Sequence, residues 1–338
     1  MVRSLLPLYF PTNVVLLDDD TNFLKHFPLL LDPGLPCMSF SSATKALEHI
    51  NNQESLLYTI AENSNVTAPD DTEELSYIDL KKLANLVYEN DRFSQITVAI
   101  IDYDMPEMNG LEVCRHIQHK EIKKILLTGK ADEKLAVEAF NDGLIHQFIQ
   151  KGNADVDKHL NRAIEKLQIE YFTDITSPIH MALTEGSSAF LADSNLRLNL
   201  SKLIQDKNII EFYLWKSPRG LLMLDDLGNT AFMFVMNEEV LQTHSDMAQA
   251  CDAPGELLNK LKSGQHVPWF PTPDGYYSND CQADWRNCLH EVNFTCGKLA
   301  KDHCSLVSPA PAGILDGSKI LPFQSYLQTF DNKNSKSR

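Results

Sequence analysis

The chain has 338 residues, of which 43% are hydrophobic and 22% charged, and its formal net charge is −16. This length suits two domains of roughly 100–200 residues each, and the composition is that of a globular protein with a core. The acidic balance argues against a strongly basic nucleic-acid surface. No apolar run reaches the about 18 residues of a transmembrane helix. The 7 cysteines contain no CxxC pair, which favours reduced thiols in a cytoplasmic protein.

The first half alternates short apolar runs with segments of helical spacing, a pattern that predicts a parallel sheet with helices on both faces. The N-terminal residues, interrupted by Pro7 and Pro11, are expected to form an arm packing on this domain. The predicted elements are, in chain order, strand Asn13–Leu17, helix Thr21–Leu31 kinked at Pro28, strand Cys37–Phe40, helix Ala43–Ile50 capped by Ser42, a strand from Val98 to Asp102, helix Leu111–Gln118, strand Lys123–Thr128, helix Glu133–Asn141 capped by Asp132 and ended by Gly143, strand Ile145–Lys151, and helix Ala154–Tyr171.

Residues 53–93 do not fit this alternation and are interpreted as an insertion between the second helix and the central strand. A polar, turn-rich part covers residues 63–71, and apolar residues at helical spacing predict a helix over Tyr77–Tyr88.

Four of the predicted strands end in, or lead directly into, a polar residue: Asp18, Asp102, Thr128 and Lys151. Asp18, Asp19 and Asp20 follow the first strand, and Asp102 ends the central one. Adjacent carboxylates repel one another, so such a cluster occurs either in a solvated turn or around a divalent cation. Because carboxyl ends of parallel strands share one edge of the sheet, the proximity of Asp102 favours the cation.

The loop Asp102-Tyr-Asp-Met-Pro-Glu-Met-Asn-Gly110 resembles the pattern D-x-x-M-P-x-M-[DN]-G of receiver domains in two-component response regulators, the CheY-like superfamily. The resemblance covers residues 13 to about 170. It implies a flavodoxin-like α/β fold with strand order 2-1-3-4-5. It also implies a phosphoprotein of a bacterial His-Asp phosphorelay, with a sensor histidine kinase or phosphotransfer protein as partner and a homodimer as one option.

Within this resemblance, Asp102 corresponds to the phosphoacceptor, since a carboxylate can form a mixed anhydride with phosphate. Mg²⁺ would be bound by Asp19, Asp102 and the backbone carbonyl of Asp104, with Asp18 acting mainly through water. The cation would offset the repulsion between the Asp102 carboxylate and the phosphoryl group that it attacks, since both are anions.

Thr128 and Lys151 correspond to the residues that bind phosphoryl oxygens, and Phe148 to the aromatic switch residue. Taken singly, Thr128 could be a strand-end cap and Lys151 a surface lysine. Because both residues occur together in the expected order and at the expected spacing, we favour their role in binding a phosphoryl group over these alternatives.

Three positions depart from the family pattern. Gly152 follows Lys151 where most receivers have a proline, often in a cis bond, so this loop is either trans or strained. Phe148 lacks a hydroxyl, so any switch works by burial alone. Asp104 places a carboxylate two residues after Asp102, which we expect to tune the lifetime of the phosphorylated state.

The resemblance implies a receiver domain over residues 1–172, and a change in composition places a linker at 173–190. Residues 191–330 are predicted to form an α+β output domain with an antiparallel meander, and 331–338 a disordered tail. The predicted elements are helix Leu196–Leu203, strands Ile209–Trp215, Leu221–Leu224 and Ala231–Met236, helices Glu238–Ala250 and Gly255–Ser263, segment Trp285–His290, a strand around Cys304–Val307, and segment Phe323–Phe330.

The output domain matches no family that we recognise, although quorum-sensing regulators of the Legionella type share this architecture. We favour a module that binds a protein or a small ligand, and we recognise no separate enzyme activity. One alternative is an enzyme acting on a nucleotide or phosphoester, for which Asp225 and Asp226 are the candidate pair. A second is a DNA-binding regulator, which the acidic charge disfavours.

Overall fold

The structure is a computed structural model that describes residues 6–60, 80–129, 133–152, 155–183, 189–296 and 302–336. The predicted turn-rich part of the insertion, the start of its helix and the Asp132 cap lie outside these residues. The chain forms two compact units that interleave along the sequence. The parallel-sheet unit comprises Phe10–Ala61, Asn90–Ser177 and Phe323–Arg338; the antiparallel-sheet unit comprises Met1–Tyr9, Glu62–Glu89 and Pro178–Pro322.

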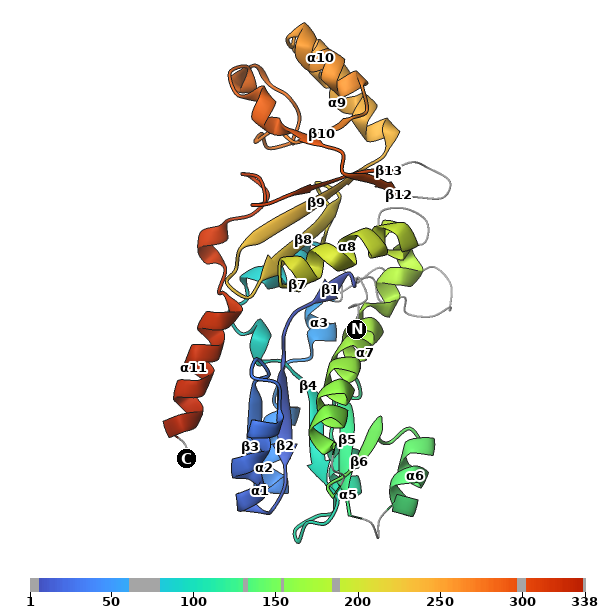
Figure 1. Ribbon diagram of the computed structural model, residues 1–338, viewed down its shortest axis with the longest axis vertical. Helices are drawn as coiled ribbons and strands as arrows, with labels where there is room; N and C mark the ends of the chain where they lie inside the picture. The colour runs from blue at the N-terminus through green and yellow to red at the C-terminus, as the bar shows by residue number, and fades with distance from the viewer. Residues whose placement is uncertain are drawn as a thin grey trace, which may run out of the picture. The chain divides into compact units, whose positions relative to one another are not determined.

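The parallel-sheet unit contains five strands in the order β3-β2-β4-β5-β6 (Figure 1). Every neighbouring pair is parallel. Numbered from the first strand of this sheet, the order is 2-1-3-4-5, so the predicted flavodoxin-like topology is confirmed. The strands are β2 (Asn13–Leu17), β3 (Cys37–Phe40), β4 (Ile96–Asp102), β5 (Lys123–Thr128) and β6 (Gln147–Gln150).

Helices cover both faces of this sheet because successive strand residues point to opposite sides. Ala99 and Ile101 face a core shared with α2, α5 and α6, whereas Val98 and Ile100 face a core shared with α7. The helical segments of the unit are α1 (Thr21–His26), η1 (Phe27–Leu30), α2 (Ala43–Asn51), α3 (Leu56–Ile60), η3 (Arg92–Ser94), α5 (Gly110–His116), α6 (Glu133–Asn141), the first part of α7 (Val156–Leu183) and α11 (Phe323–Lys336).

Helices α7 and α11 extend much further than their patterns predict. Helix α7 continues past Tyr171 into the expected linker. The hydroxyls of Thr173 and Thr176 donate to backbone carbonyls four residues earlier, so these polar residues fit inside the helix. Helix α11 continues to Lys336, whereas residues 331–338 were expected to be disordered. Its start is held by tertiary packing, since Phe323 is buried beside Phe93.

Helix caps differ from the expectation at one position. Ser42 precedes α2, but its side chain accepts no hydrogen bond from the helix. Its hydroxyl donates instead to the Glu107 carboxylate at 3.3 Å. At Pro28 the prediction of a distortion agrees with the structure, because α1 ends at His26 and the chain continues as the 3-10 segment η1.

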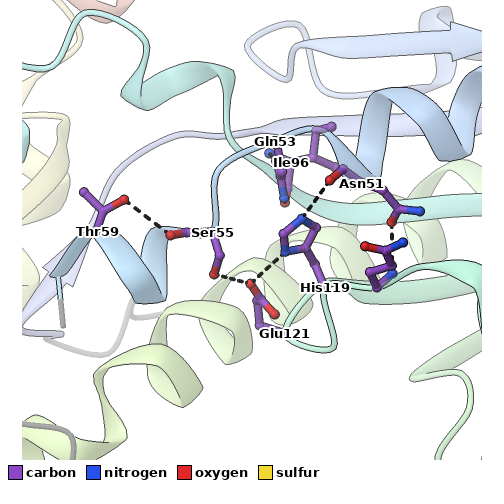
Figure 2. Close-up of polar contacts among 8 residues, drawn as sticks. Asn51, Gln53, Ser55, Thr59, Ile96, His119 and Glu121 are labelled. Atoms are coloured by element: carbon purple, nitrogen blue, oxygen red, sulfur yellow. Dashed lines mark hydrogen bonds and ion pairs between the residues drawn. The ribbon is translucent and has the colours of Figure 1, made fainter. Parts of the chain in front are cut away.

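A polar cluster fixes the chain where the insertion leaves this unit (Figure 2). The Gln53 amide bonds both backbone groups of Ile96, donating to its carbonyl at 3.2 Å and accepting from its N–H at 2.8 Å. The Ser55 hydroxyl donates to Glu121 at 2.6 Å, and His119 lies 3.5 Å from the same carboxylate. The start of the insertion is therefore bound to the first residue of β4 and to the residues that precede β5.

The antiparallel-sheet unit contains a six-stranded sheet in the order β1-β7-β8-β9-β13-β12 and a two-stranded sheet, β10-β11. The predicted meander is present as β7 (Ile209–Trp215), β8 (Gly220–Asp225) and β9 (Thr230–Met236). The other elements are β1 (Leu8–Tyr9), α4 (Leu80–Asn85), η2 (Leu86–Tyr88), η5 (Ala189–Ala192), α8 (Ser194–Asp206), α9 (Glu238–Ala250), α10 (Gly255–Lys262), β10 (His266–Pro268), η6 (Asn279–Cys281), η7 (Trp285–Cys288), β11 (Leu289–Glu291), β12 (Phe294–Cys296), β13 (Asp302–Val307) and η8 (Gly317–Lys319).

The N-terminal arm packs as expected on the first domain at Phe10, which is buried beside Phe93 and Phe172, whereas the described residues before Phe10 belong to the antiparallel-sheet unit. Leu8 and Tyr9 pair with Tyr213 and Phe212 of β7, and the Leu214 N–H donates to the Pro7 carbonyl at 2.7 Å. Leu8 and Tyr9 thus form an edge strand of the six-stranded sheet. Both residues are buried, so they hide apolar surface as well as backbone groups at this edge.

Replacing Gly220 by alanine is expected to destabilise the antiparallel-sheet unit by about 2–4 kcal/mol. A Cβ at this position would lie 2.1 Å from the Met233 carbonyl oxygen and 2.7 Å from the Phe232 ring, so β8 and β9 would have to separate. Urea unfolding followed by tryptophan fluorescence measures this, since all 3 tryptophans lie in this unit. Gly255→Ala is the control, because nothing lies within 4 Å of its added Cβ. Equal stability of the two variants would contradict the clash.

Acid is expected to weaken the parallel-sheet unit through His146. Burial, followed by the charges of Lys123 and Lys124, lowers the pKa of His146 to about 4 from its ordinary value of 6.5. Between these two pH values the unfolded chain binds more protons than the folded one. The contribution of His146 to the free energy of unfolding is therefore fully present above pH 6.5 and is lost as the pH falls toward 4. Because the ring is only partly buried, we expect a loss of about 1–2 kcal/mol.

Hydrogen exchange of β5 and β6 peptides between pH 7 and pH 4, corrected for the intrinsic exchange rate, measures this loss. His146→Gln should flatten the dependence, whereas His159→Gln, at an exposed position of α7, should leave it unchanged. The same pH slope in the His146→Gln variant would rule out this residue as the cause.

Candidate functional site

Four strand ends bring the predicted polar residues to one edge of the parallel sheet. Asp18 follows β2, Asp102 ends β4, Thr128 ends β5 and Lys151 follows β6. The register places Asp102 beside Leu127 and Thr128 beside Gln150, so these ends are level with one another. The Lys151 N–H donates to the Thr128 carbonyl at 3.1 Å, which fixes the backbone next to the lysine.

Lys151 links the two buried carboxylates of the site. Its Nζ lies 2.6 Å from Asp18 Oδ2 and 2.9 Å from Asp102 Oδ1. Asp18 is fully buried and Asp102 is 5% exposed, so neither carboxylate is well solvated. An ammonium ion between two carboxylates is the arrangement that lets such charges stay buried.

The pKa values of these groups reflect opposing effects. Burial raises the pKa of Asp102 above its ordinary value, and the Asp18 charge adds to this, although the hydrogen bond and charge of Lys151 act in the opposite direction. Burial alone would lower the pKa of Lys151, but its bonds to Asp18 and Asp102 outweigh burial and raise that pKa. The lysine is therefore held charged between its partners.

The three consecutive aspartates have three different roles. Asp18 accepts from Lys151 and, through Oδ1, from the Asp20 N–H at 2.9 Å. Asp20 caps α1, since its carboxylate accepts from the Asn22 and Phe23 N–H groups. Asp19 is exposed and contributes to the acidic group at the sheet edge. The sequence analysis gave Asp18 and Asp19 different parts in cation binding, but it did not identify Asp20 as the cap of α1.

The acidic group fits a hard divalent cation. Asp18, Asp19 and Asp102 each offer a carboxylate oxygen, and these oxygens lie within 4.8 Å of one another. Carboxylate oxygens are the ligands that Mg²⁺ prefers in proteins. The Thr128 hydroxyl is buried without a hydrogen-bond partner, so a donor is left free at the end of β5. The donor set thus suits Mg²⁺ together with an anionic group.

The loop after β4 approaches the Asp102 backbone closely at Gly110. A Cβ there would lie 2.3 Å from the Asp102 carbonyl oxygen and 2.9 Å from Leu126 Cδ1, so only glycine fits. The Gly110 N–H donates to the Tyr103 carbonyl at 2.9 Å, and Asn109 and Glu112 form a reciprocal capping box. These contacts close the loop and hold the Asp102 backbone in place.

Two predicted residues lie away from the ionic contacts. Asp104 is exposed, in the loop that follows Asp102. Phe148 is half-buried on β6, and its ring lies 6.4 Å from that of Phe140 on α6 in an edge-on arrangement. The Lys151–Gly152 peptide is trans, since the cis bonds of the described residues are those before Pro218 and Pro309.

Phe23 is a neighbour of the site that the pattern did not reveal. The Lys151 Nζ lies 4.7 Å from the centre of the Phe23 ring. An aromatic face beside an ammonium ion stabilises the cation, and the ring also limits where the lysine can move. In the sequence Phe23 is only one apolar residue of the first helix, so no signal distinguishes it from the core.

The alternative site at Asp225 and Asp226 gains no support. The Asp225 carboxylate accepts hydrogen bonds from the Leu227 and Asn229 N–H groups and from the Asn229 side chain, at 2.8–3.0 Å. This is the arrangement of an aspartate that closes a turn. Among the described residues, the group of acids that could hold a cation is the one at Asp102.

Comparisons with known proteins agree with this arrangement. The family described as response regulator receiver domain matches residues 77–164. The structure of the Legionella pneumophila response regulator LqsR matches with a TM-score of 0.73 and 36% sequence identity, covering 96% of this chain and 96% of that chain. A CheY-like receiver domain protein from Methanospirillum hungatei JF-1 is 20% identical over 47% of this chain and 96% of its own, with a TM-score of 0.32.

The comparison with curated proteins gave no match. Among the described residues, no helix has the length and apolar character required to cross a bilayer. The LqsR match extends over almost the whole of both chains, and the receiver family matches the segment that contains Asp102, Thr128 and Lys151. The chain therefore belongs to the response-regulator family of two-component signalling, with a receiver domain as its parallel-sheet unit.

Proposed function

We propose that this response regulator accepts a phosphoryl group on Asp102 and thereby controls its antiparallel-sheet unit. The observation that carries the proposal is the double contact of Lys151 with Asp18 and Asp102. A lysine at this place is close enough to transfer one of its contacts from a carboxylate to a phosphoryl oxygen on Asp102. The donor would be a phosphohistidine of a sensor kinase or phosphotransfer protein.

In this reaction an oxygen of Asp102 bonds to phosphorus. The bond between phosphorus and the donor nitrogen breaks, and its electron pair stays on the imidazole, which then takes a proton. The Thr128 hydroxyl, which is buried and has no partner, would donate to one phosphoryl oxygen. The Lys151 ammonium would pair with another.

The residues that would hold Mg²⁺ are Asp18, Asp19 and Asp102, together with the backbone carbonyl of Asp104. The contacts of Asp18 support a role mainly through water, because one of its oxygens accepts from Lys151 and the other from the Asp20 N–H. When bound, Mg²⁺ would neutralise negative charge on the transferring phosphoryl group. Lys151 acts in the same sense from the side of β6.

Repacking of α6 is the proposed route from phosphate to signal. Phosphorylation adds roughly −1.5 to −2 charges. As Thr128 and Lys151 are drawn toward the phosphoryl group, Phe148 can move inward from its half-buried position and away from Phe140. Three apolar side chains of α6 are well exposed: Leu135, Val137 and Phe140, at 43%, 39% and 48%. A face of this kind could bind a second copy of the chain.

The test is to treat the full chain with acetyl phosphate and MgCl₂, and to follow intact mass, peptide mapping and sedimentation. We expect one phosphoryl group, located on Asp102, and a larger sedimentation coefficient. Failure to incorporate phosphoryl under conditions that modify a receiver used as positive control would overturn the phosphoacceptor proposal. Incorporation without any change in sedimentation would instead overturn the proposed dimer.

Asp104→Asn is expected to lengthen the half-life of the phosphorylated protein roughly fivefold, which corresponds to about 1 kcal/mol in the barrier to hydrolysis. An exposed carboxylate next to the phosphoryl group can accept a hydrogen bond from the attacking water, and an amide oxygen is a weaker acceptor. Loss of phosphoryl after removal of acetyl phosphate is the measurement. Glu107→Gln, in the same loop, is the control. An unchanged half-life would refute this role for Asp104.

We propose that the antiparallel-sheet unit binds a protein or a small ligand, as expected for an output domain without a recognised catalytic motif. The turn-closing hydrogen bonds of Asp225 weigh against an enzyme built on that residue. Duplex DNA retention at increasing salt concentrations would test the DNA-binding alternative.

A further inference from the structure

Two buried thiols lie side by side at the edge of the six-stranded sheet. Cys296 is the last residue of β12, and Cys304 lies in β13, the neighbouring antiparallel strand. Their sulfur atoms are 3.1 Å apart. Cys296 is 4% exposed and Cys304 is fully buried, so this contact is enclosed by the protein.

The two sulfurs need to move little to form a covalent bond. A disulfide requires about 2.05 Å between its sulfurs, roughly 1 Å less than their present separation. The β12–β13 register places Phe294 opposite Cys304 and Cys296 opposite Asp302. The cysteines are therefore diagonal neighbours on one face of the two strands, and antiparallel pairing holds them together when they are reduced.

Charged and buried groups surround Cys304. The hydrogen bond with Cys296, followed by burial, raises the pKa of Cys304, and the Asp302 charge adds to the rise. The Arg219 guanidinium acts in the opposite direction, and it is held by two 3.1 Å contacts with the Asp302 carboxylate. Cys304 is fully buried, whereas Cys296, the last residue of β12, is 4% exposed, so Cys296 is the thiol that a peroxide reaches first.

We propose that Cys296 and Cys304 form an intramolecular disulfide when the protein meets a hydroperoxide, making the edge of the output sheet a site of reversible thiol oxidation. In the first step the Cys296 sulfur attacks the peroxide, the O–O bond breaks, and a sulfenic acid and an alcohol or water form. In the second step the Cys304 sulfur displaces hydroxide from that sulfenic acid, and water leaves. Two electrons pass from the two thiols to the peroxide.

The cross-link would fasten β12 to the rest of the sheet. β12 is a three-residue edge strand, whose pairing partner in the sheet is β13. A disulfide at its end opposes separation of the two strands and reduces the conformational freedom of the unfolded chain. Oxidation would thus make the edge more rigid, whatever its binding partner, and a thiol reductant would restore the starting state.

The experiment exposes the full chain, under native conditions, to dilute hydrogen peroxide, and then denatures and alkylates it with N-ethylmaleimide. The reduced protein has 7 thiols to alkylate, and the oxidised one is expected to have two fewer, 7 − 2 = 5. Lys298 and Lys301 separate the two cysteines in the sequence, so trypsin yields two peptides joined by the disulfide. Dithiothreitol should return both thiols.

A stability measurement accompanies the mapping. Oxidation is expected to raise the Tm observed by tryptophan fluorescence by roughly 5 °C, because a short loop is closed. Cys296→Ser and Cys304→Ser should each abolish the shift. The double variant Cys281→Ser/Cys288→Ser, which removes two buried thiols of the same unit, should retain it.

The peptide map of the wild-type protein decides the matter even if a variant fails to fold. Full alkylation of Cys296 and Cys304 after peroxide treatment would overturn the proposal. So would a disulfide from either residue to another cysteine, or oxidation of Cys296 to a sulfinic acid without any cross-link.

Discussion

Asp102→Asn is expected to lower phosphoryl incorporation from acetyl phosphate by roughly 10³-fold or more, as loss of the attacking group does in other covalent catalysts. The amide oxygen of asparagine carries no charge, so it cannot form the mixed anhydride at a useful rate. The substitution keeps the shape of the side chain and leaves an oxygen that can accept from Lys151. The fold should therefore remain, which makes a loss of incorporation interpretable.

The comparison is with Asp104→Asn, which removes an exposed carboxylate two residues away and should reach at least the wild-type level of incorporation, because its phosphorylated form is expected to be hydrolysed more slowly. Intact mass gives the extent of modification, and hydroxylamine treatment identifies an acyl phosphate. Far-UV circular dichroism checks the fold of both variants. Continued modification of the Asp102→Asn protein at another aspartate would show that the nucleophile had been assigned to the wrong residue.

Lys151→Met is expected to lower the free energy of unfolding of the receiver by about 2–4 kcal/mol when Mg²⁺ is removed with EDTA. The substitution leaves Asp18, which is fully buried, and Asp102, which is 5% exposed, side by side without a cation. Two adjacent carboxylates in a poorly solvated site repel each other. One of the two carboxylates can take up a proton, which limits the loss of stability. The expected loss is therefore smaller than that for a buried charge that stays ionised and unpaired.

Three comparisons make this result specific. Lys158→Met removes an exposed ion pair with Asp155 in the same unit, and it should cost no more than about 1 kcal/mol. Adding Asp18→Asn to Lys151→Met should recover part of the loss, because one of the two unpaired charges is then gone. Millimolar Mg²⁺ should stabilise Lys151→Met more than the wild type. Hydrogen exchange of β4 peptides that is equal in Lys151→Met and wild type would refute the electrostatic role.

The sequence predicted the receiver well because its signals are local. An apolar run that stops at a carboxylate defines both a buried strand and its functional end, and β2 and β5 have the bounds that their patterns predict. The site followed from the order of Asp18, Asp102, Thr128 and Lys151, because parallel strands end at a common edge. Their use of the phosphoryl group and of Mg²⁺ stays a prediction.

The features that the sequence did not predict depend on contacts distant in the chain. β1 has two residues, too few for a periodic pattern, and it exists because β7 offers it a free edge. Helix α11 passes the expected start of the disordered tail because Tyr326 and Phe323 pack on Phe93, far away in sequence. The pairing of Lys151 with Asp18 was also missed, because a strand-end pattern gives neighbours but not which of them are in contact.

The chain passes from one unit to the other five times, between residues 9 and 10, 61 and 62, 89 and 90, 177 and 178, and 322 and 323. The receiver is consequently not a detachable N-terminal piece. A protein shortened after residue 172 would lose α11, whose Tyr326 hydroxyl donates to Asn13 at 2.9 Å, and it would keep β1 without its partner β7. Gene dissection that treats this regulator as two consecutive modules would therefore expose apolar surface in both fragments, and poor solubility of either would reflect the cut rather than the function.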